Sequence, residues 1–281
     1  MPANPIGDLR DSIVVAVDGS DHAARALRWA AEQAFVERRR LVAVAVGDDA
    51  GSEAERAVGA ARELHPDLPV KAAVFPGDPR QVLIDLSAHA HLLVVGSRGR
   101  GAVQSMMLGS VSAAVSAHAT CPVVVCRPTA ADRVQRGVIV GADGTPESLP
   151  VIEFAYRQAA LWELPLTVLH CFWDAVAAVA QYRQASGKEA AAPELEDLRA
   201  LLAVSVAGFA EEYPDVPVTL TLEHGLVDEA LGPRDGGWDL IVVGRHPMTT
   251  QGRVLTGSIA TAVVERAHST VAVVPEGPRS S

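Results

Sequence analysis

The fold is decided by the stretch Ile13-Val14-Val15-Ala16-Val17-Asp18-Gly19-Ser20, which recurs 125 residues later as Val138-Ile139-Val140-Gly141-Ala142-Asp143-Gly144-Thr145. Each copy is a short apolar run that ends in Asp-Gly and a hydroxyl residue. The same offset pairs Trp29 with Phe154 and Leu41 with Leu166. A repeat of this length is too long for a solenoid unit, so it indicates a duplicated domain.

The two copies differ in length. Leu92-Leu93-Val94-Val95-Gly96 matches Leu240-Ile241-Val242-Val243-Gly244 at an offset of 148 residues, so the second copy contains about 23 additional residues. The Ala-rich segment 175–196 is expected to hold them, as a surface helix or flap. We therefore expect a first domain over residues 1–127, a linker over 128–136 and a second domain over 137–281.

Continuous apolar runs at residues 13–17, 41–46, 70–75, 92–95 and 123–125 are typical of parallel strands that are buried on both faces. The segment between the first two runs has a helical apolar face, with Ser20 as its predicted N-cap. Its counterpart is expected to begin at Thr145-Pro146. The predicted class is α/β, with two tandem, doubly wound, five-stranded parallel sheets. In the second copy, Gly232-Pro233 and Gly236-Gly237 are expected to break the third helix.

Composition excludes several functions. The formal charge of −10 argues against a nucleic-acid binder. No apolar run has the roughly 18 residues of a membrane span, and the first residues do not resemble a signal peptide, so no membrane association and a cytoplasmic location are expected. Lys71 and Lys188 are the only lysines, so chemistry that needs a lysine has almost no candidates. The three cysteines form no C-x-x-C pair, and core packing is favoured over redox sensing at Cys171.

A glycine-rich loop follows the fourth apolar run. It reads Gly96-Ser97-Arg98-Gly99-Arg100-Gly101 and continues to Gly109-Ser110, which opens a helix. Glycines let the backbone approach a phosphate, and a helix N-terminus offers unpaired N–H groups with partial positive charge. The loop is neither a Walker P-loop nor a dinucleotide fingerprint. It is interpreted as an anion cradle, or alternatively as a turn that lets a helix pack on the sheet.

With these motifs, and with Gly77-Asp78-Pro79 and Cys121-Pro122-Val123, the chain resembles a tandem universal stress protein of the actinobacterial type, in the ATP-binding branch. The resemblance covers residues 11–276 and implies strand order 3-2-1-4-5 in each domain. It implies that the G-x-x-G-x9-G-S segment holds the phosphates and ribose of ATP, that the end of the first strand holds the nucleoside, and that the end of the second meets adenine. The residues carried over are Gly96, Arg98, Gly99, Gly109, Ser110, Val111, Ala16, Val17, Asp18 and Val46.

Alternatives stay open for several of these residues. Asp18 would repel a triphosphate, so it suits ribose hydroxyls, the adenine amine or a bound Mg²⁺; equally, it is typical of an Asx-turn. Arg98 either balances phosphate charge or is a solvated loop residue. Ser110 caps its helix, contacts a phosphate, or does both.

The second copy departs from the pattern. It keeps Asp143, Gly244, Gly257 and Ser258, but Pro247, preceded by His246, replaces the glycine at position 99, and proline offers no N–H. Its site is therefore expected to be degenerate.

The expected function is an ATP-binding, stress-response regulatory protein, at most a slow ATPase, acting through an unidentified protein partner. The rival hypotheses are an ATPase or phosphotransferase, and a nucleotide-free interaction scaffold. The two domains are expected to pair as an intramolecular pseudo-dimer that can also form a homodimer.

Overall fold

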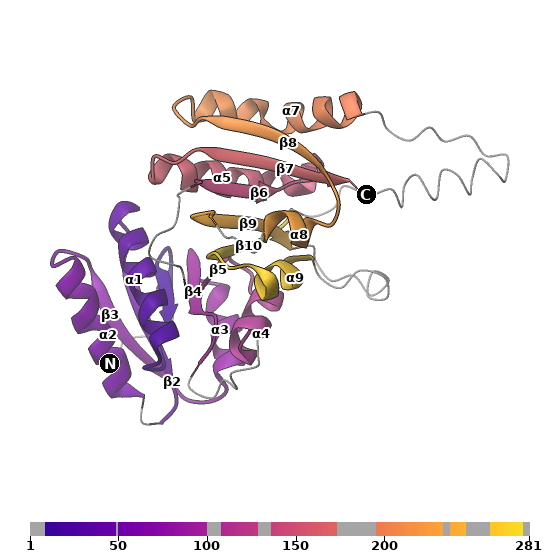
Figure 1. Ribbon diagram of the computed structural model, residues 1–281. Coiled ribbons are helices and arrows are strands. Elements are labelled where there is room, and N and C mark those ends of the chain that lie inside the picture. Colours follow the sequence, from indigo (N-terminus) through magenta and orange to yellow (C-terminus); the bar gives the residue numbers. More distant parts are fainter. Residues whose placement is uncertain are drawn as a thin grey trace, which may run out of the picture.

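The computed structural model of the chain describes residues 9–48, 50–99, 108–128, 136–172, 195–232, 237–245 and 259–277. Within them the chain forms two α/β halves that share one sheet (Figure 1). The first half contains β1 (Ile13–Ala16), α1 (Asp21–Val36), β2 (Leu41–Val46), α2 (Gly51–Leu64), β3 (Val70–Phe75), α3 (Pro79–Ser87), β4 (Leu92–Gly96), α4 (Ser110–His118) and β5 (Val123–Cys126). These strand bounds agree with the predicted runs to within one residue.

The second half repeats this series. It contains β6 (Val138–Gly141), the 3-10 turn η2 (Pro146–Ser148), α5 (Leu149–Leu161), β7 (Leu166–Phe172), α7 (Leu195–Glu212), β8 (Val218–His224), α8 (Val227–Leu231), β9 (Leu240–Arg245), α9 (Ile259–Arg266) and β10 (Val271–Pro275). The strand orders β3-β2-β1-β4-β5 and β8-β7-β6-β9-β10 are both the expected 3-2-1-4-5.

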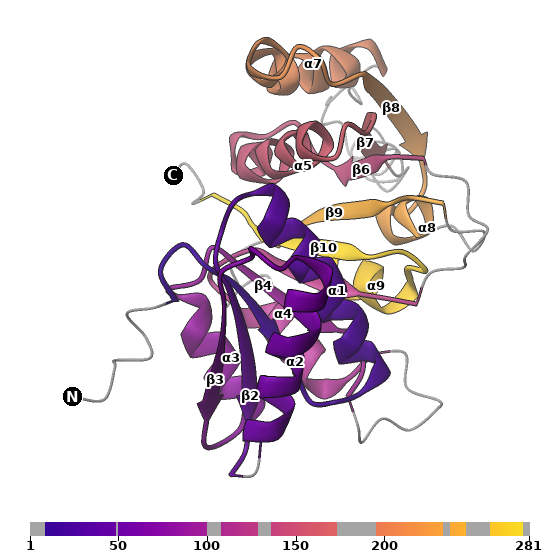
Figure 2. The same ribbon diagram turned by 90° about the vertical axis from the view of Figure 1, so that its left-hand side faces the viewer.

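The two five-stranded sheets are joined edge to edge into a single ten-stranded sheet. β5 and β10 pair antiparallel, and Val124 lies opposite Ala272, which is its counterpart in the repeat. A local two-fold axis therefore passes between these two residues. The expected internal pairing of the halves takes the form of continuous backbone hydrogen bonding, which also covers one edge of each sheet (Figures 1 and 2).

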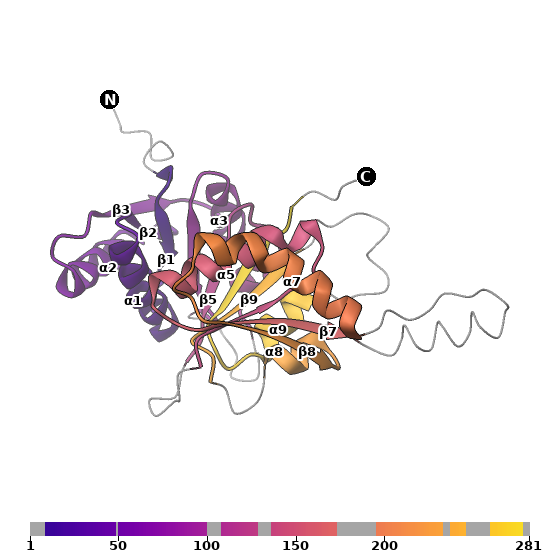
Figure 3. The ribbon, with the colours of Figure 1, turned by 90° about the horizontal axis from the view of Figure 1, so that it is seen from above.

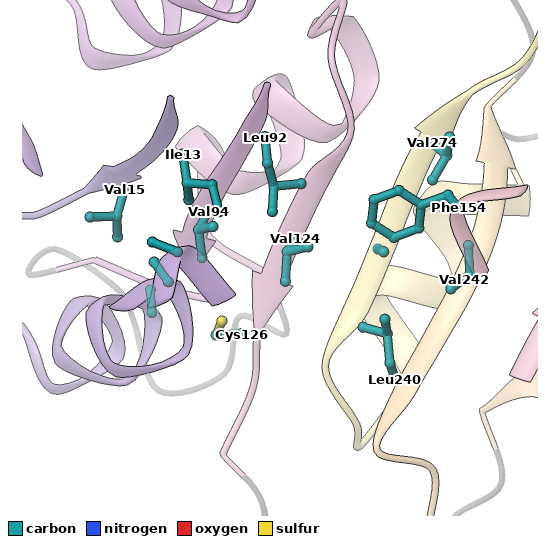
Figure 4. Packing of buried hydrophobic residues seen from close by; sticks show 14 of the residues in the cluster. Ile13, Val15, Leu92, Val94, Val124, Cys126, Phe154, Leu240, Val242 and Val274 are labelled. Atoms are coloured by element: carbon teal, nitrogen blue, oxygen red, sulfur yellow. The ribbon is translucent and has the colours of Figure 1, made fainter. Parts of the chain in front are cut away.

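Both faces of this sheet are covered by helices. α1, α2, α5 and α7 pack on one face, and α3, α4, α8 and α9 pack on the other; Figure 3 shows this division for the second half. Ile13 and Val15 face the first layer whereas Val14 faces the second, because side chains alternate along a strand. Figure 4 shows the first layer passing from Val124 of one half to Phe154 and Val274 of the other.

The predicted start of α1 is confirmed: the Ser20 side chain accepts a hydrogen bond from the Ala23 N–H at 3.2 Å. Its predicted apolar face is buried and consists of Ala23, Leu27, Ala30, Ala31 and Ala34. The prediction for Thr145-Pro146 was partly wrong. A 3-10 turn with Pro146 as its first residue comes first there, the Thr145 side chain makes no capping bond, and α5 begins only at Leu149.

The third helix of the second half is short, as its glycines predicted. α8 spans 5 residues against 9 in α3, and it ends at Gly232. Residues 233–236 lie outside the described part of the chain, as do most of the predicted linker and residues 175–194 of the predicted flap. The end of that predicted insertion, Leu195 and Glu196, is the first turn of α7.

Candidate functional site

The carboxyl ends of β1 and β4 meet at the point where the chain reverses its winding direction. These strands are parallel neighbours, so the loop after β1 and the loop after β4 lie against each other. A Cβ added to Gly96 would lie 2.7 Å from the main-chain carbon and oxygen of His22. Only glycine lets the first turn of α1 pack this closely on the end of β4.

Gly99 lies beside Asp18 in the same corner. A Cβ on Gly99 would be 2.8 Å from the Asp18 Oδ2 atom, so the predicted glycine loop and the predicted acid of β1 are brought together. The Asx-turn alternative for Asp18 is also observed. Its Oδ1 atom accepts hydrogen bonds from the Ser20 N–H at 3.0 Å and from the Ser20 hydroxyl at 2.6 Å. One carboxylate oxygen thus shapes the turn, and the other faces the glycine loop.

Two hydrogen bonds join the loop after β4 to the start of α4. The Gly109 N–H donates to the Ser97 carbonyl at 2.8 Å, and the Ser112 hydroxyl donates to the Gly96 carbonyl at 2.6 Å. A Cβ on Gly109 would lie 3.2 Å from the Arg98 Cα atom. Both ends of the G-x-x-G-x9-G-S segment therefore form one unit, which we call the cradle: residues 96–99 and 109–112. Residues 100–107 lie outside the described ranges.

Ser110 does not cap α4, so that alternative was wrong. Gly109 is the N-cap residue and makes no side-chain capping bond, while Ser110 is the exposed first residue of the helix. An N-terminus without a side-chain cap presents its N–H groups to solvent or to an anion. Val111, the next predicted residue, is half-buried in that first turn.

His22 belongs to this site and was not predicted from the sequence. Its Nδ1 atom lies 3.0 Å from the Ser97 hydroxyl oxygen. Burial and the nearby charges of Arg25 and Arg98 lower the pKa of His22, so its neutral form is favoured. The Ser97 contact spans 75 residues of sequence, and no local pattern marks it.

The remaining predicted residues lie around the cradle. Val17 extends β1 by one backbone bond, from its N–H to the Val44 carbonyl at 2.8 Å, and Ala16 is the half-buried end of β1. Val46 is the half-buried end of the neighbouring strand β2. Arg98 is half-buried and close enough to influence His22 and Arg127 electrostatically.

The second half repeats only part of this arrangement. Asp143 accepts hydrogen bonds from the Thr145 N–H at 2.9 Å and from its hydroxyl at 2.7 Å, as Asp18 does from Ser20. Gly244 ends its strand as Gly96 does, but the Glu276 carboxylate occupies the space over it where the first half has the main chain of His22. Predicted residues Gly257 and Ser258 lie outside the described residues, together with His246 and Pro247.

Cys171, which matches the adenine-facing position of the first half, is half-buried near the end of β7. Burial raises the pKa of its thiol to about 11, so the thiol is protonated at neutral pH. This favours the core-packing interpretation, since the thiolate is the reactive form.

Two negative findings concern only the described ranges. No helix there combines the length and apolar character needed to cross a bilayer. Among the same residues, no group of three or more His, Cys, Asp and Glu side chains is arranged to hold a metal ion.

Comparison with known proteins identifies the family. The model of the universal stress protein family matches residues 45–127 and 136–275. Universal stress protein Rv2005c of Mycobacterium tuberculosis is 32% identical over 240 residues, covering 84% of this chain and 76% of the relative. A universal stress protein of Mycolicibacterium smegmatis is 29% identical, covering 93% of this chain and 96% of the relative.

The same architecture occurs in a solved structure. A universal stress protein from Archaeoglobus fulgidus has a similar fold, with a TM-score of 0.66 and 19% sequence identity, covering 95% of this chain and 98% of that chain. The chain belongs to the universal stress protein family, and it carries two such domains in tandem.

Proposed function

We propose that this protein is a nucleotide-binding regulatory protein that holds ATP in the cradle of its first half. The observation that carries this proposal is the union of residues 96–99 with 109–112 beside Asp18. The two hydrogen bonds at Gly109 and Ser112 hold a glycine-rich backbone against a helix N-terminus without a side-chain cap. Such a site binds an anion through N–H groups and needs no lysine.

The charges in the site indicate where each end of the nucleotide would bind. The triphosphate belongs with Gly96, Arg98, Gly99 and the first turn of α4, where N–H groups and a guanidinium are gathered. Asp18 would repel phosphate oxygens, so it belongs with the ribose hydroxyls, with the adenine amine, or with a Mg²⁺ ion that separates it from the phosphates. The end of β2 at Val46 lies on the far side of β1 from the cradle, where it would meet the base through its backbone.

Mg²⁺ would accompany the nucleotide. Mg²⁺ in nucleotide sites is held by one or two carboxylates together with substrate phosphates and water. Asp18 fits that role as one carboxylate, because its Oδ2 atom lies beside Gly99 in the glycine loop. The ion would neutralise phosphate charge near that carboxylate.

The occupied site is proposed to act on shape or partners and not to run a fast reaction. Fast phosphoryl transfer needs positioned metal ligands and strong stabilisation of the leaving group. Lys71 lies on β3, which is the edge strand of the first half and is separated from β4 by two other strands, β2 and β1. The rival function is an ATPase or phosphotransferase on the same fold.

We expect ATP hydrolysis to be slow, with a turnover below roughly 1 s⁻¹, which is the lower end of the range for kinases. In its described part, the cradle supplies N–H groups, and the carboxylate that lies against it is that of Asp18. Steady-state phosphate release with Mg²⁺ measures this rate. A turnover in the range of kinases would favour the enzyme over the regulator.

Mass spectrometry tests the proposal most directly. The protein is purified natively, denatured, and its released small molecules are identified. Co-purifying ATP supports the regulatory site, and ADP as the main species supports an enzyme. Release of no nucleotide, together with no ATP binding in titration calorimetry, would leave the interaction scaffold as the better reading.

The two halves are expected to bind ATP unequally, with one tight site per chain. The Glu276 carboxylate beside Gly244 repels phosphate, and Pro247 lacks the N–H that Gly99 has. One missing bond to a charged group is worth about 1.5–3 kcal/mol, or roughly tenfold to a hundredfold in affinity.

Titration of the full chain measures this asymmetry as a stoichiometry near one. The halves should not be separated for the test, because cutting between them would expose the paired edges of β5 and β10. Two equal sites would show that the second half tolerates both Glu276 and Pro247.

A further inference from the structure

The two helices that border the cradle are held at their opposite ends by the other half of the chain. α4 contributes Gly109 and Ser112 to the cradle, and α1 packs its first turn on Gly96. Farther along each helix, the partner groups come from Arg245 and Trp162, which are more than 120 residues away in sequence. The second half therefore contacts both supports of the proposed nucleotide site.

Arg245 binds the C-terminal end of α4. Its Nη1 atom donates to the Ala117 carbonyl at 3.0 Å, and its Nη2 atom donates to the Ala119 carbonyl. The last carbonyls of a helix have no partners within it and carry partial negative charge, so a guanidinium there satisfies and stabilises them. α4 is only 9 residues long, so the end fixed by Arg245 is two to three turns from the cradle.

Arg245 occupies the same position in the repeat as Ser97. The carbonyl of Ser97 accepts the Gly109 N–H at the beginning of α4, whereas Arg245 binds the end of that helix. Equivalent positions of the two halves thus hold the two ends of one helix. Arg127 makes the reverse contact, from the end of β5 to the Val264 and Glu265 carbonyls at the end of α9.

Trp162 holds α1 in a similar way. Its Nε1–H donates to the Gln33 Oε1 atom at 2.9 Å, and the Gln33 side chain is fully buried. A buried amide that loses its partner costs free energy, so this bond fixes where α1 lies relative to α5. The first turn of α1 carries His22, whose main chain covers Gly96 and whose ring contacts Ser97.

We propose that Arg245 and Trp162 are positioning residues for the nucleotide site of the first half, so that the second half sets the geometry of a cradle to which it adds no ligand contact. This inference rests on the proposed function. Hydrogen bonds to phosphate weaken steeply with misalignment, and a site that must be ordered on binding loses affinity. Removing the Arg245 hydrogen bonds at the far end of α4 is expected to weaken ATP binding about tenfold. Removing the Trp162 hydrogen bond to α1 is expected to weaken it less.

The test compares four variants of the full chain. Arg245→Met removes both donors and keeps a long side chain, and Arg245→Lys keeps one charged donor group. Trp162→Phe removes the indole N–H and keeps an aromatic, though smaller, ring. Arg266→Met is the matched control, because Arg266 pairs with Asp228 inside the second half. ATP dissociation constants are measured by calorimetry at a temperature where circular dichroism shows every variant folded. Hydrogen exchange of the α4 first-turn amides is followed without nucleotide.

The expected result is about tenfold weaker ATP binding for Arg245→Met, partial recovery for Arg245→Lys, a few-fold loss for Trp162→Phe, and no change for Arg266→Met. The first-turn amides of α4 should exchange faster in Arg245→Met than in the control. If Arg245→Met does not fold, Trp162→Phe decides by the same measurements. Affinity and exchange equal to the control, in a wild-type chain that binds ATP, would overturn the positioning role. A wild-type chain that binds no ATP would instead overturn the proposed function.

Discussion

Replacing Gly99 by proline is expected to weaken ATP binding by about a hundredfold while the fold survives. Proline removes an N–H whose bond to a charged group is worth up to about 3 kcal/mol, and it fixes φ near −65°. It also places ring atoms toward Asp18, because even a Cβ at this position would lie 2.8 Å from Oδ2. Gly99 is exposed and follows the strand, so the core is untouched. Titration calorimetry on protein with normal circular dichroism measures the effect.

The matched control is Gly59→Ala in the exposed face of α2. No atom lies within 4 Å of an added Cβ there, and alanine is favoured over glycine in a helix by about 1 kcal/mol. This variant should keep full affinity and gain slightly in thermal stability. If Gly99→Pro bound ATP as tightly as Gly59→Ala does, the cradle would not be the phosphate site.

Removing the Glu37 carboxylate is expected to cost about 3–5 kcal/mol of the free energy of unfolding, the range for breaking a buried ion pair. The Glu37 side chain is 6% exposed and lies just beyond the end of α1. Its Oε1 atom accepts from Gln33 Nε2 at 2.5 Å, and its Oε2 atom lies 2.9 Å from both Arg39 Nε and His91 Nε2. Glu37→Ala leaves these three groups without that acceptor, and Gln33 is the residue that also bonds Trp162.

Because of the same carboxylate, the free energy of unfolding depends on pH in the acid range. Burial acts to raise the pKa of Glu37, but hydrogen bonds from His91 and Gln33 outweigh it and lower the pKa to about 2, from an ordinary 4.5. A lowered pKa stabilises the folded state above the unfolded pKa, and this contribution is lost as the pH falls from about 5 towards 2. The denaturant concentration at which half of the wild-type protein is unfolded should therefore decrease as the pH is lowered through this range.

The matched variants are Glu37→Gln and Glu63→Gln. Glu63 is an exposed residue near the end of α2, so its removal should leave both stability and acid sensitivity as they are. Glu37→Gln should have a lower free energy of unfolding than the wild type at pH 7. It should also lose less of that free energy than the wild type when the pH is lowered. An acid profile for Glu37→Gln that parallels the wild type would show that other carboxylates govern acid unfolding.

The elements that local chemistry specifies were predictable from the sequence alone. Continuous apolar runs such as 41–46 are strands because they are buried on both faces, and Ser20 begins α1 because its side chain accepts an N–H of the first turn. The repeat showed the duplication, and the motif set showed the family. The glycines after Leu231 predicted the short α8. The strand, helix-start and helix-length signals each lie within a few residues of the feature that they predict.

The way in which the halves join, and the contacts that support the candidate site, became visible only in the three-dimensional structure. Nothing local to 123–126 or 271–275 says that these strands pair with each other, because a continuous apolar run shows that a strand is buried but not which strand lies beside it. His22 lies in the first turn of α1, whereas Arg245 and Glu276 lie at strand ends. Their partners are distant in the chain or belong to the other half. Such contacts depend on where whole helices pack, and packing is set by the sum of many long-range apolar contacts that no short motif records.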